Sequence, residues 1–397
     1  RILICPDGFG GTLAAPEVAA ALAEGWRSVA PGDDLLLRPL SDGGPGFVDV
    51  LAASLPGECF EVPTTDPLGR PATGRLLLSG GVGYLECAHA CGLHLLSPAE
   101  RDPLITSSYG LGSLIEAAVA AGAREVVIGL GGSGTNDAGA GMLAALGVLA
   151  RDAAGHRLPG GGAALADCRS VTGPPHPAGG VTLIAATDVD SPLTGPDGAS
   201  AVFGPQKGAT ARDVPRLDAA LGTFAAVLER DLPGCPAGLA ALPGGGAAGG
   251  IGAAMLAIGG RRRSGIALVR AHTGLDAAMA GVDLVLTGEG SFDAQSLRGK
   301  VVAGVAAAAS AAGRPCLVVA GRVEVGAAEA AQIGVGGSCS LVEYFGEQAA
   351  ALTRPAEGLR AIGARLASAQ HQPSAQHQPS AQHQPSAQHR PGDDHRP

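Results

Sequence analysis

The chain is poor in aromatic residues, lysine and asparagine. Only 3% of its 397 residues are Phe, Trp or Tyr, whereas 64 are glycine. Small residues let helices lie close to a sheet, so we expect tightly packed layers rather than a core of large rings. Lys207 and Lys300 are the only lysines and Asn136 is the only asparagine. All three stand close to glycine, which makes them candidates for a ligand contact.

Other features that the sequence lacks exclude whole classes of function. A net charge of −9 argues against a nucleic-acid groove, and the basic run at residues 261–263 is more typical of a solvated loop. The eight cysteines form no CxxC pair, as expected in a reducing cytoplasm. The Cys and His residues between 87 and 94 match no standard zinc finger, so buried cysteines are the favoured interpretation.

Neither the start of the chain nor the uncharged segment at residues 236–260 predicts a membrane anchor. The chain opens directly on an apolar strand, so we expect no signal peptide. Residues 236–260 carry no charge, but they are rich in Gly and Pro and short of large apolar side chains. We therefore expect a cytoplasmic protein without a membrane segment.

Two successive strand–loop–helix units open the chain and predict a parallel, doubly wound sheet. The strand at residues 2–5 leads into a loop with Asp7, and the strand at residues 35–37 leads into a loop with Asp42. Ligands of such sheets lie beyond the carboxyl ends of the strands, where both aspartates fall. Each Asp could instead serve only as a turn former or helix N-cap, and the two interpretations are about even.

A glycine-rich turn at residues 131–137 lies between a predicted strand and a predicted helix. Backbone N–H groups and the helix dipole converge there, an arrangement that suits phosphate oxygens. The spacing is not GxxxxGK[ST], so an ordinary tight turn remains the alternative. The residues expected to bind nucleotide phosphates are Gly131, Gly132, Ser133, Thr135, Asn136 and Asp137, with Lys207 and Lys300 as the cations.

Further acidic residues follow two later apolar runs. Asp188 and Asp190 end one run and share a face, because side chains alternate along a strand; a capped turn is the alternative. Glu289 and Asp293 follow the other. Mg²⁺ is commonly held by one or two carboxylates and nucleotide oxygens, and we expect Asp190 and Glu289 in this role. In phosphoryl transfer a carboxylate orients the accepting hydroxyl, a role expected of Asp293 or Asp188.

The sequence pattern changes near residue 62, where an antiparallel pair of strands is predicted, and changes back near residue 281. This indicates one domain formed by residues 1–61 and 281–367, with residues 62–280 inserted as a second α/β domain. From Ser368 the sequence repeats SAQHQP, which cannot bury a core. Residues 368–397 are therefore predicted to be a disordered tail.

Several sequence blocks, in order, resemble the type-1 bacterial glycerate kinases, which phosphorylate D-glycerate with ATP. The resemblance runs from Ile2 to about Ala367. The blocks are P-D-G-F at residues 6–9, S-D-G-G at 41–44, T-D-P-L-G-R at 65–70, G-G-S-G-T-N-D-A-G-A-G-M at 131–142, G-A-S-A-V-F-G-P-Q-K-G-A at 198–209 and T-G-E-G-S-F-D at 287–293.

The resemblance implies a flavodoxin-like domain built from both chain ends and an inserted domain of restriction-enzyme-like topology. It also implies an active site in the cleft between them that uses ATP and Mg²⁺. Asp7, Asp42 and Arg70 are expected to bind the substrate. Both a monomer and a homodimer remain open, as does the choice between the 2- and 3-hydroxyl of glycerate.

Three positions depart from the family pattern. Gly8 and Gly10 replace a serine and a lysine of the first loop, and Pro45 replaces a glutamate of the second. Losing a charge-assisted contact costs about 1.5–3 kcal/mol. The alternatives are therefore an impaired or non-catalytic ligand-binding paralogue, or a kinase of another small hydroxy acid. A dinucleotide oxidoreductase is disfavoured, because no GxGxxG follows the first strand.

Overall fold

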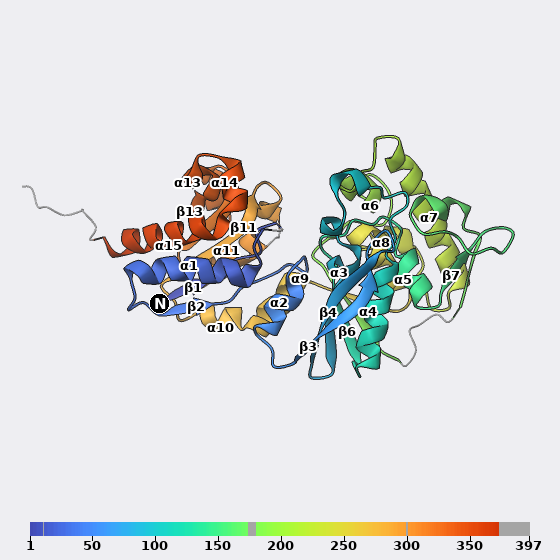
Figure 1. The fold of residues 1–397 in the computed structure, drawn as a ribbon, viewed down its shortest axis with the longest axis horizontal. Coiled ribbons are helices and arrows are strands. Elements are labelled where there is room, and N and C mark those ends of the chain that lie inside the picture. Colours follow the sequence, from blue (N-terminus) through green and yellow to red (C-terminus); the bar gives the residue numbers. More distant parts are fainter. Residues whose placement is uncertain (11, 174–179, 299–300, 373–397) are drawn as a thin grey trace, which may run out of the picture.

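The computed structural model describes residues 1–10, 12–173, 180–298 and 301–372. In these residues a five-stranded and a six-stranded sheet form two neighbouring lobes (Figure 1), and a small two-stranded sheet pairs β7 (Leu149–Arg151) with β8 (Ser170–Thr172). The predicted α/β class is confirmed. None of the helices in the described ranges has the length and apolarity that a membrane crossing requires.

The first sheet is entirely parallel and has the order β13-β12-β11-β1-β2. Counted within this sheet from β1, the order is 2-1-3-4-5, the flavodoxin-like arrangement that the resemblance implied. Its order reverses between β1 and β11, which is where such sheets bind ligands. The strands are β1 (Ile2–Ile4), β2 (Leu35–Leu37), β11 (Leu284–Phe292), β12 (Cys316–Val323) and β13 (Val335–Ser340).

Alternating residues of β1 supply two buried cores on opposite faces of the first sheet. Ile2 and Ile4 pack with α1 and α15, the helices nearest the two chain ends. Leu3 packs with α11 on the other face. The helices of this lobe are α1 (Ala15–Val29), α10 (Leu275–Met279), α11 (Val301–Ala311), α12 (Ala327–Gln332), α13 (Leu341–Phe345), α14 (Gln348–Thr353) and α15 (Pro355–His371).

The last helix extends further than the sequence predicted. Ser368, the first residue of the predicted tail, donates from Oγ to Ala364 O, and the helix continues to His371. His371 Nε2 lies 2.9 Å from Asp33 Oδ2, a contact that anchors this end of the helix to the start of the chain. The rest of the predicted tail, residues 373–397, lies outside the described residues.

The second sheet has the order β10-β9-β6-β5-β4-β3 and is mixed. The hairpin partners β3, β4 and β5 are antiparallel, whereas β5, β6, β9 and β10 are parallel. Arg261–Arg263, interpreted above as a solvated loop, forms the exposed edge strand β10. The other strands are β3 (Glu58–Thr65), β4 (Pro71–Ser79), β5 (Val82–Glu86), β6 (Glu125–Gly129) and β9 (Thr182–Ala186).

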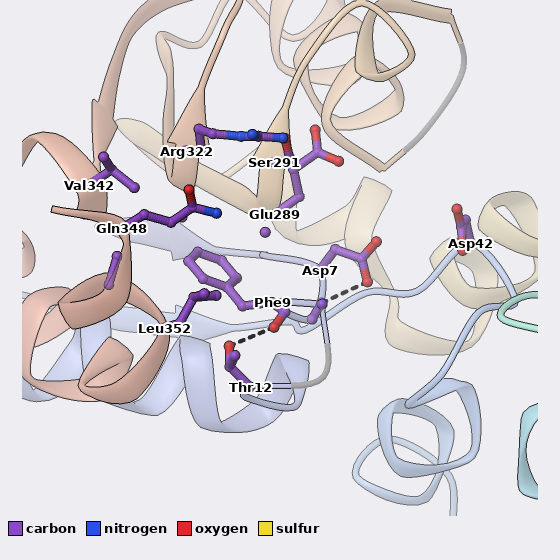
Figure 2. A pocket seen from close by; sticks show the side chains of 15 residues that line it. Asp7, Phe9, Thr12, Asp42, Glu289, Ser291, Arg322, Val342, Gln348 and Leu352 are labelled. Carbon is purple, nitrogen blue, oxygen red and sulfur yellow. Dashed lines mark hydrogen bonds between the residues drawn. The ribbon is translucent and has the colours of Figure 1, made fainter. Parts of the chain in front are cut away.

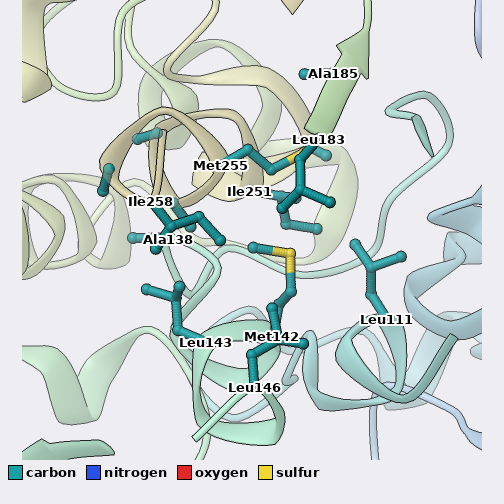
Figure 3. Close-up of a cluster of buried hydrophobic side chains, with 14 of the residues drawn as sticks. Leu111, Ala138, Met142, Leu143, Leu146, Leu183, Ala185, Ile251, Met255 and Ile258 are labelled. Carbon is teal, nitrogen blue, oxygen red and sulfur yellow. The ribbon is translucent and has the colours of Figure 1, made fainter. Parts of the chain in front are cut away.

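Helices around the second sheet close its core. The spacing of Met142, Leu143, Leu146 and Leu149 predicts one buried face on a helix that begins at residue 138. The first three lie in the core beside Leu183 and Ile251 (Figure 3), whereas Leu149 is only partly buried. The predicted helix is shorter than expected, however, because α5 ends at Ala145 and residue 149 begins β7. The helices are α3 (Ala88–Cys91), α4 (Tyr109–Ala120), α5 (Ala140–Ala145), α6 (Ala199–Phe203), α7 (Asp213–Asp231) and α8 (Ala247–Ala257).

Two helices, α2 (Phe47–Ala52) and α9 (Gly265–Thr273), contribute to a core that both sheets share. Leu3 of the first sheet and Ile184 of the second belong to one buried cluster with them. Glu86, the last residue of β5, also joins the lobes: its carboxylate accepts hydrogen bonds from Val48 N at 2.7 Å and Gly46 N at 3.1 Å. A carboxylate of the second sheet thus caps a helix of the first lobe.

The contact between α1 and α15 yields a stability prediction. A Cβ atom at Gly25 would lie 1.9 Å from Arg360 O, so Gly25→Ala forces these helices apart. We expect the free energy of unfolding to fall by at least about 2 kcal/mol, measured by urea denaturation. Gly32→Ala is the matched control in open space and should change it by less than about 0.5 kcal/mol. Equal stabilities of the two variants would contradict this packing.

Candidate active site

A cavity of about 370 Å³ lies at the carboxyl ends of β1, β11 and β12, where the strand order reverses (Figure 2). Its size lies in the range of pockets that bind small ligands. The polar lining consists of Asp7, Thr12, Asp42, Glu289, Ser291, Arg322 and Gln348, and the apolar lining includes Phe9, Val342, Ala351 and Leu352. Asp7, Asp42 and Glu289, three of the predicted site residues, therefore share one cavity.

The loop after β1 is held rigidly enough to position Asp7. The backbone N–H of Asp7 donates to Gly288 O at 2.8 Å, which ties the loop to β11. The Asp7 carboxylate accepts from Gly8 N at 2.7 Å, and Thr12 Oγ1 donates to Phe9 O at 2.6 Å. The turn-forming and site-forming interpretations of this aspartate are thus compatible, because its carboxylate closes the turn and also lines the cavity.

Asp42 and Asp188 converge on the N-terminus of α9 from the two sheets. A Cβ at Gly265 would lie 2.2 Å from Asp42 O, so the loop after β2 touches the first residue of the helix. The Asp188 carboxylate, from the loop after β9, accepts from Ile266 N at 2.9 Å. The carboxyl ends of both sheets therefore supply acidic residues to one region.

Two of the predicted acids belong to β11 and the turn that follows it. Glu289 lies within the strand, is buried and lines the cavity. Asp293 directly follows the strand, and its Oδ1 accepts from Gln295 N at 2.8 Å, which closes the turn. The side chain of Asp293 is not part of the described cavity lining.

Arg70 and Asp190 lie away from the cavity, each paired with an opposite charge. The Arg70 guanidinium contacts Asp66 Oδ2 at 2.5 Å and Glu100 Oε1 at 2.7 Å, and so holds the turn between β3 and β4. Asp190 Oδ1 lies 2.5 Å from Arg262 Nη1 on the edge of the second sheet. In this structure their charges serve contacts within the protein, and the partners Glu100 and Arg262 are too distant in sequence for a local pattern to reveal.

The glycine-rich loop after β6 is mostly buried, and only Gly131 and Gly132 are accessible from outside. The Asp137 carboxylate accepts hydrogen bonds from Gly139 N and Gly141 N, both at 3.1 Å, at the start of α5. It also accepts from the backbone and hydroxyl of Ser108. The chain's own carboxylate thus fills the helix N-terminus to which the sequence analysis assigned a phosphate.

Asn136 and Lys207 hold this loop from within. Asn136 Nδ2 donates to Ser200 Oγ at 2.9 Å. Lys207 Nζ donates to Ser133 Oγ at 2.9 Å and to Thr135 O at 2.7 Å. Burial lowers the pKa of Lys207 to about 8, so its ammonium still carries most of its charge at neutral pH. Lys300, the other predicted phosphate contact, lies outside the described residues.

Sequence reasoning missed Arg322 and Gln348, which also line the cavity. Arg322 lies at the carboxyl end of β12, and the rule that placed Asp7 and Asp42 at the site applies to that strand as well. Gln348 begins α14, and no local motif connects it with the other lining residues.

The donor set of the cavity fits a magnesium ion bound together with phosphates. No cluster of three or more His, Cys, Asp or Glu side chains suited to a metal occurs in the described parts of the chain. Kinases commonly bind Mg²⁺ through one or two carboxylates, with water and substrate phosphates completing the shell. Asp7 and Glu289 supply carboxylates of this kind at adjacent strands of the cavity.

The fold and this acidic cavity define an α/β enzyme whose site lies at the carboxyl edge of a parallel sheet. Comparison with known proteins narrows the class. Residues 2–371 match the Glycerate kinase family. The chain is 42% identical to the glycerate kinase of Bacillus subtilis (strain 168) over 328 residues, which cover 81% of this chain and 85% of that protein.

Two further relatives agree. Glycerate 2-kinase of Escherichia coli (strain K12) is 39% identical over 326 residues, covering 81% of this chain and 85% of the relative. A crystal structure from Salmonella typhimurium LT2, described provisionally as glycerate kinase 2, has a TM-score of 0.74 at 40% identity and covers 93% of this chain and 97% of its own. The chain belongs to the glycerate kinase family and is an enzyme of the kinase class, which confirms the resemblance found in its motifs.

The capping carboxylate Glu86 yields a prediction on pH. Burial raises the pKa of Glu86 to about 7, although the hydrogen bonds from Val48 and Gly46 act in the opposite direction and lower it. The folded protein therefore holds this proton more tightly than the unfolded chain. The contribution of Glu86 to stability is fully present below the ordinary pKa of 4.5 and is lost as the pH rises to 7. We expect this group to lower the free energy of unfolding by up to about 1.4 kcal/mol per pH unit in that window.

Urea denaturation at several pH values checks this, with Glu86→Gln as the test variant. Glu86→Gln should lose the decline, because its amide does not titrate. Glu58→Gln, an exposed substitution on β3, should keep the wild-type profile. The same decline in Glu86→Gln as in the wild type would show that other groups cause it.

Proposed function

We propose that the protein transfers the γ-phosphoryl group of ATP to D-glycerate at the cavity beside β1 and β11. Membership of the glycerate kinase family supports the substrate pair. The single observation that supports this position is the convergence of Asp7, Asp42 and Glu289 in one cavity at the switch point of the first sheet. The junction of α9 with both Asp42 and Asp188 supports a site in the cleft between two domains.

The two lobes support the predicted division into residues 1–61 with 281–367 and residues 62–280, except at residues 275–279, because α10 lies with the first lobe (Figure 1). Strands of the first sheet come from both chain ends, and those of the second come from the middle. The boundary at residue 62 falls within β3, which pairs with β4 in the second sheet. We therefore propose that the second domain begins with β3.

Catalysis of phosphoryl transfer depends mainly on the placement of charges, because its transition state is loose. Asp188 or Asp293 orients the accepting hydroxyl and takes its proton. The position of Asp188 beside Asp42 at the N-terminus of α9 supports the first assignment. The position of Asp293 directly after β11, the strand that carries Glu289, supports the second.

Asp7 and Glu289 would hold Mg²⁺, which when bound neutralises charge on the phosphate oxygens. The exposed backbone of Gly131 and Gly132 is the part of the glycine-rich loop available to the nucleotide. Ser133, Thr135, Asn136, Asp137 and Lys207 support this loop from within. Arg70 and Asp190 do not enter the proposal, because each pairs with another residue outside the cavity.

The product should be 2-phosphoglycerate, by analogy with the E. coli relative named glycerate 2-kinase. Purified protein, Mg·ATP and D-glycerate, followed by phosphorus NMR, should show this product forming. Glu289→Gln should lower kcat/KM by at least about 100-fold, because it removes a charge from the cavity. Glu343→Gln, which changes an exposed side chain of α13, is the control and should behave like the wild type. No phosphorylated product from the wild type would overturn the proposal.

Two variants decide which aspartate accepts the proton. Replacing the general base should lower kcat by roughly 10²–10⁴-fold and leave the KM for glycerate nearly unchanged. Steady-state kinetics of Asp188→Asn and Asp293→Asn test this, with thermal unfolding to check that each variant folds. Asparagine still accepts the hydrogen bond from Ile266 N or Gln295 N, so both turns persist. Full turnover by both variants would exclude both residues from this role.

A further inference from the structure

The proposed glycerate site must bind an anion. Three of its described lining side chains are acids, Asp7, Asp42 and Glu289, and one is a cation, Arg322. Glycerate is an anion at neutral pH, because carboxylic acids of this kind titrate near pH 4. A cation that contacts the carboxylate stabilises such an anion in the site, and Arg322 is the cation among the described lining residues.

Arg322 is positioned to supply that charge. It lies in register with Ser291 on the neighbouring strand, and its Nη2 donates to Ser291 Oγ at 3.3 Å. Figure 2 shows its side chain extending along the cavity toward Ser291 and Glu289. A Cβ at Gly321 would lie 2.5 Å from Gly290 O, so the paired strands admit no side chain at this position, which lines the cavity beside Arg322.

The present partners of Arg322 are easily exchanged. Its Nη1 lies 3.1 Å from Glu324 Oε1, and the two side chains are 47% and 49% exposed. Ion pairs this exposed contribute little to stability, because water and salt screen them. The other partner, the Ser291 hydroxyl, is neutral. A substrate carboxylate offers the planar guanidinium two parallel hydrogen bonds together with a full opposite charge. Glu324 provides the charge through a single contact, and Ser291 provides one hydrogen bond without a charge.

We infer that Arg322 determines the specificity of this site by binding the carboxylate of the acid to be phosphorylated. The inference rests on the proposed function and names the group that selects a hydroxy acid over a neutral polyol. Arg322 holds the carboxylate end from β12. The acids of the loops after β1 and β2 and of β11 then face the hydroxyl end of the same molecule.

Three variants test the role: Arg322→Gln removes the charge, Arg322→Lys keeps the charge without the fork, and Glu324→Gln removes only the ion pair. Arg322→Gln should raise the KM for D-glycerate roughly 10- to 100-fold, as expected for a lost charge-assisted hydrogen bond. Arg322→Lys should fall between it and the wild type. The KM of Glu324→Gln for D-glycerate should stay within about twofold of the wild-type value, because the Arg322 guanidinium remains.

The preference for glycerate over glycerol, which lacks the carboxylate, separates a binding role of Arg322 from a merely structural one. A structural defect would lower kcat/KM for both substrates and leave the preference unchanged. In a binding role, kcat/KM for glycerol should be the same in the wild type and Arg322→Gln, so the preference should fall by the factor seen for glycerate. The KM for ATP should also stay constant. Equal effects of Arg322→Gln and Glu324→Gln, or a raised KM for ATP alone, would overturn the inference.

Calorimetric titration of D-glycerate into the same proteins separates this inference from the proposed function. A wild type that binds glycerate but does not phosphorylate it contradicts the proposed function alone, and at least roughly tenfold weaker binding by Arg322→Gln then still supports the inference. Equal binding by a correctly folded Arg322→Gln, shown by unchanged thermal unfolding, would overturn the inference alone.

Discussion

The site depends on a contact of backbone against backbone where the two sheets meet. Gly131 N donates to Gly43 O at 2.9 Å, and a Cβ at Gly131 would lie 2.3 Å from the Cα of Gly44. A Cβ at Gly43 would likewise lie 2.6 Å from Ala186 O. Because these glycines lack side chains, the loops after β2, β6 and β9 approach one another closely enough to present Asp42 and Asp188 in one region.

Electrostatics explains how the glycine-rich loop keeps its shape. Burying Lys207 disfavours its charge, yet the ammonium donates to Ser133 and to the carbonyl of Thr135. Asp137 is equally buried and accepts hydrogen bonds from the first turn of α5. Both charges therefore serve the loop itself. Asn136 and Lys207, two of the three rare residues, thus support this loop from within.

Much of the fold was predictable because the signals are local. Apolar runs followed by short polar loops indicated the parallel sheet and placed Asp7, Asp42 and Glu289 at or near strand ends. The lengths of individual elements were less certain. The helix predicted from residue 138 ended early, at Ala145. The helix α15 extended past Ser368, where His371 contacts Asp33, a residue too distant in sequence for a local pattern to include. The predicted domain boundaries and catalytic roles stay predictions.

The sequence by itself determined the order of strands and helices, the family, and the acidic character of the site. Only the tertiary structure decided which charges face the cavity. Arg70 and Arg322 look alike in the sequence, since each follows a glycine. One pairs with Asp66 and Glu100 at a turn of the second sheet, and the other lines the cavity of the first. Both arginines have a partner close by in the sequence, Asp66 for Arg70 and Glu324 for Arg322. The difference lies in which sheet carries each arginine and which segments enclose it, and no local pattern carries that information.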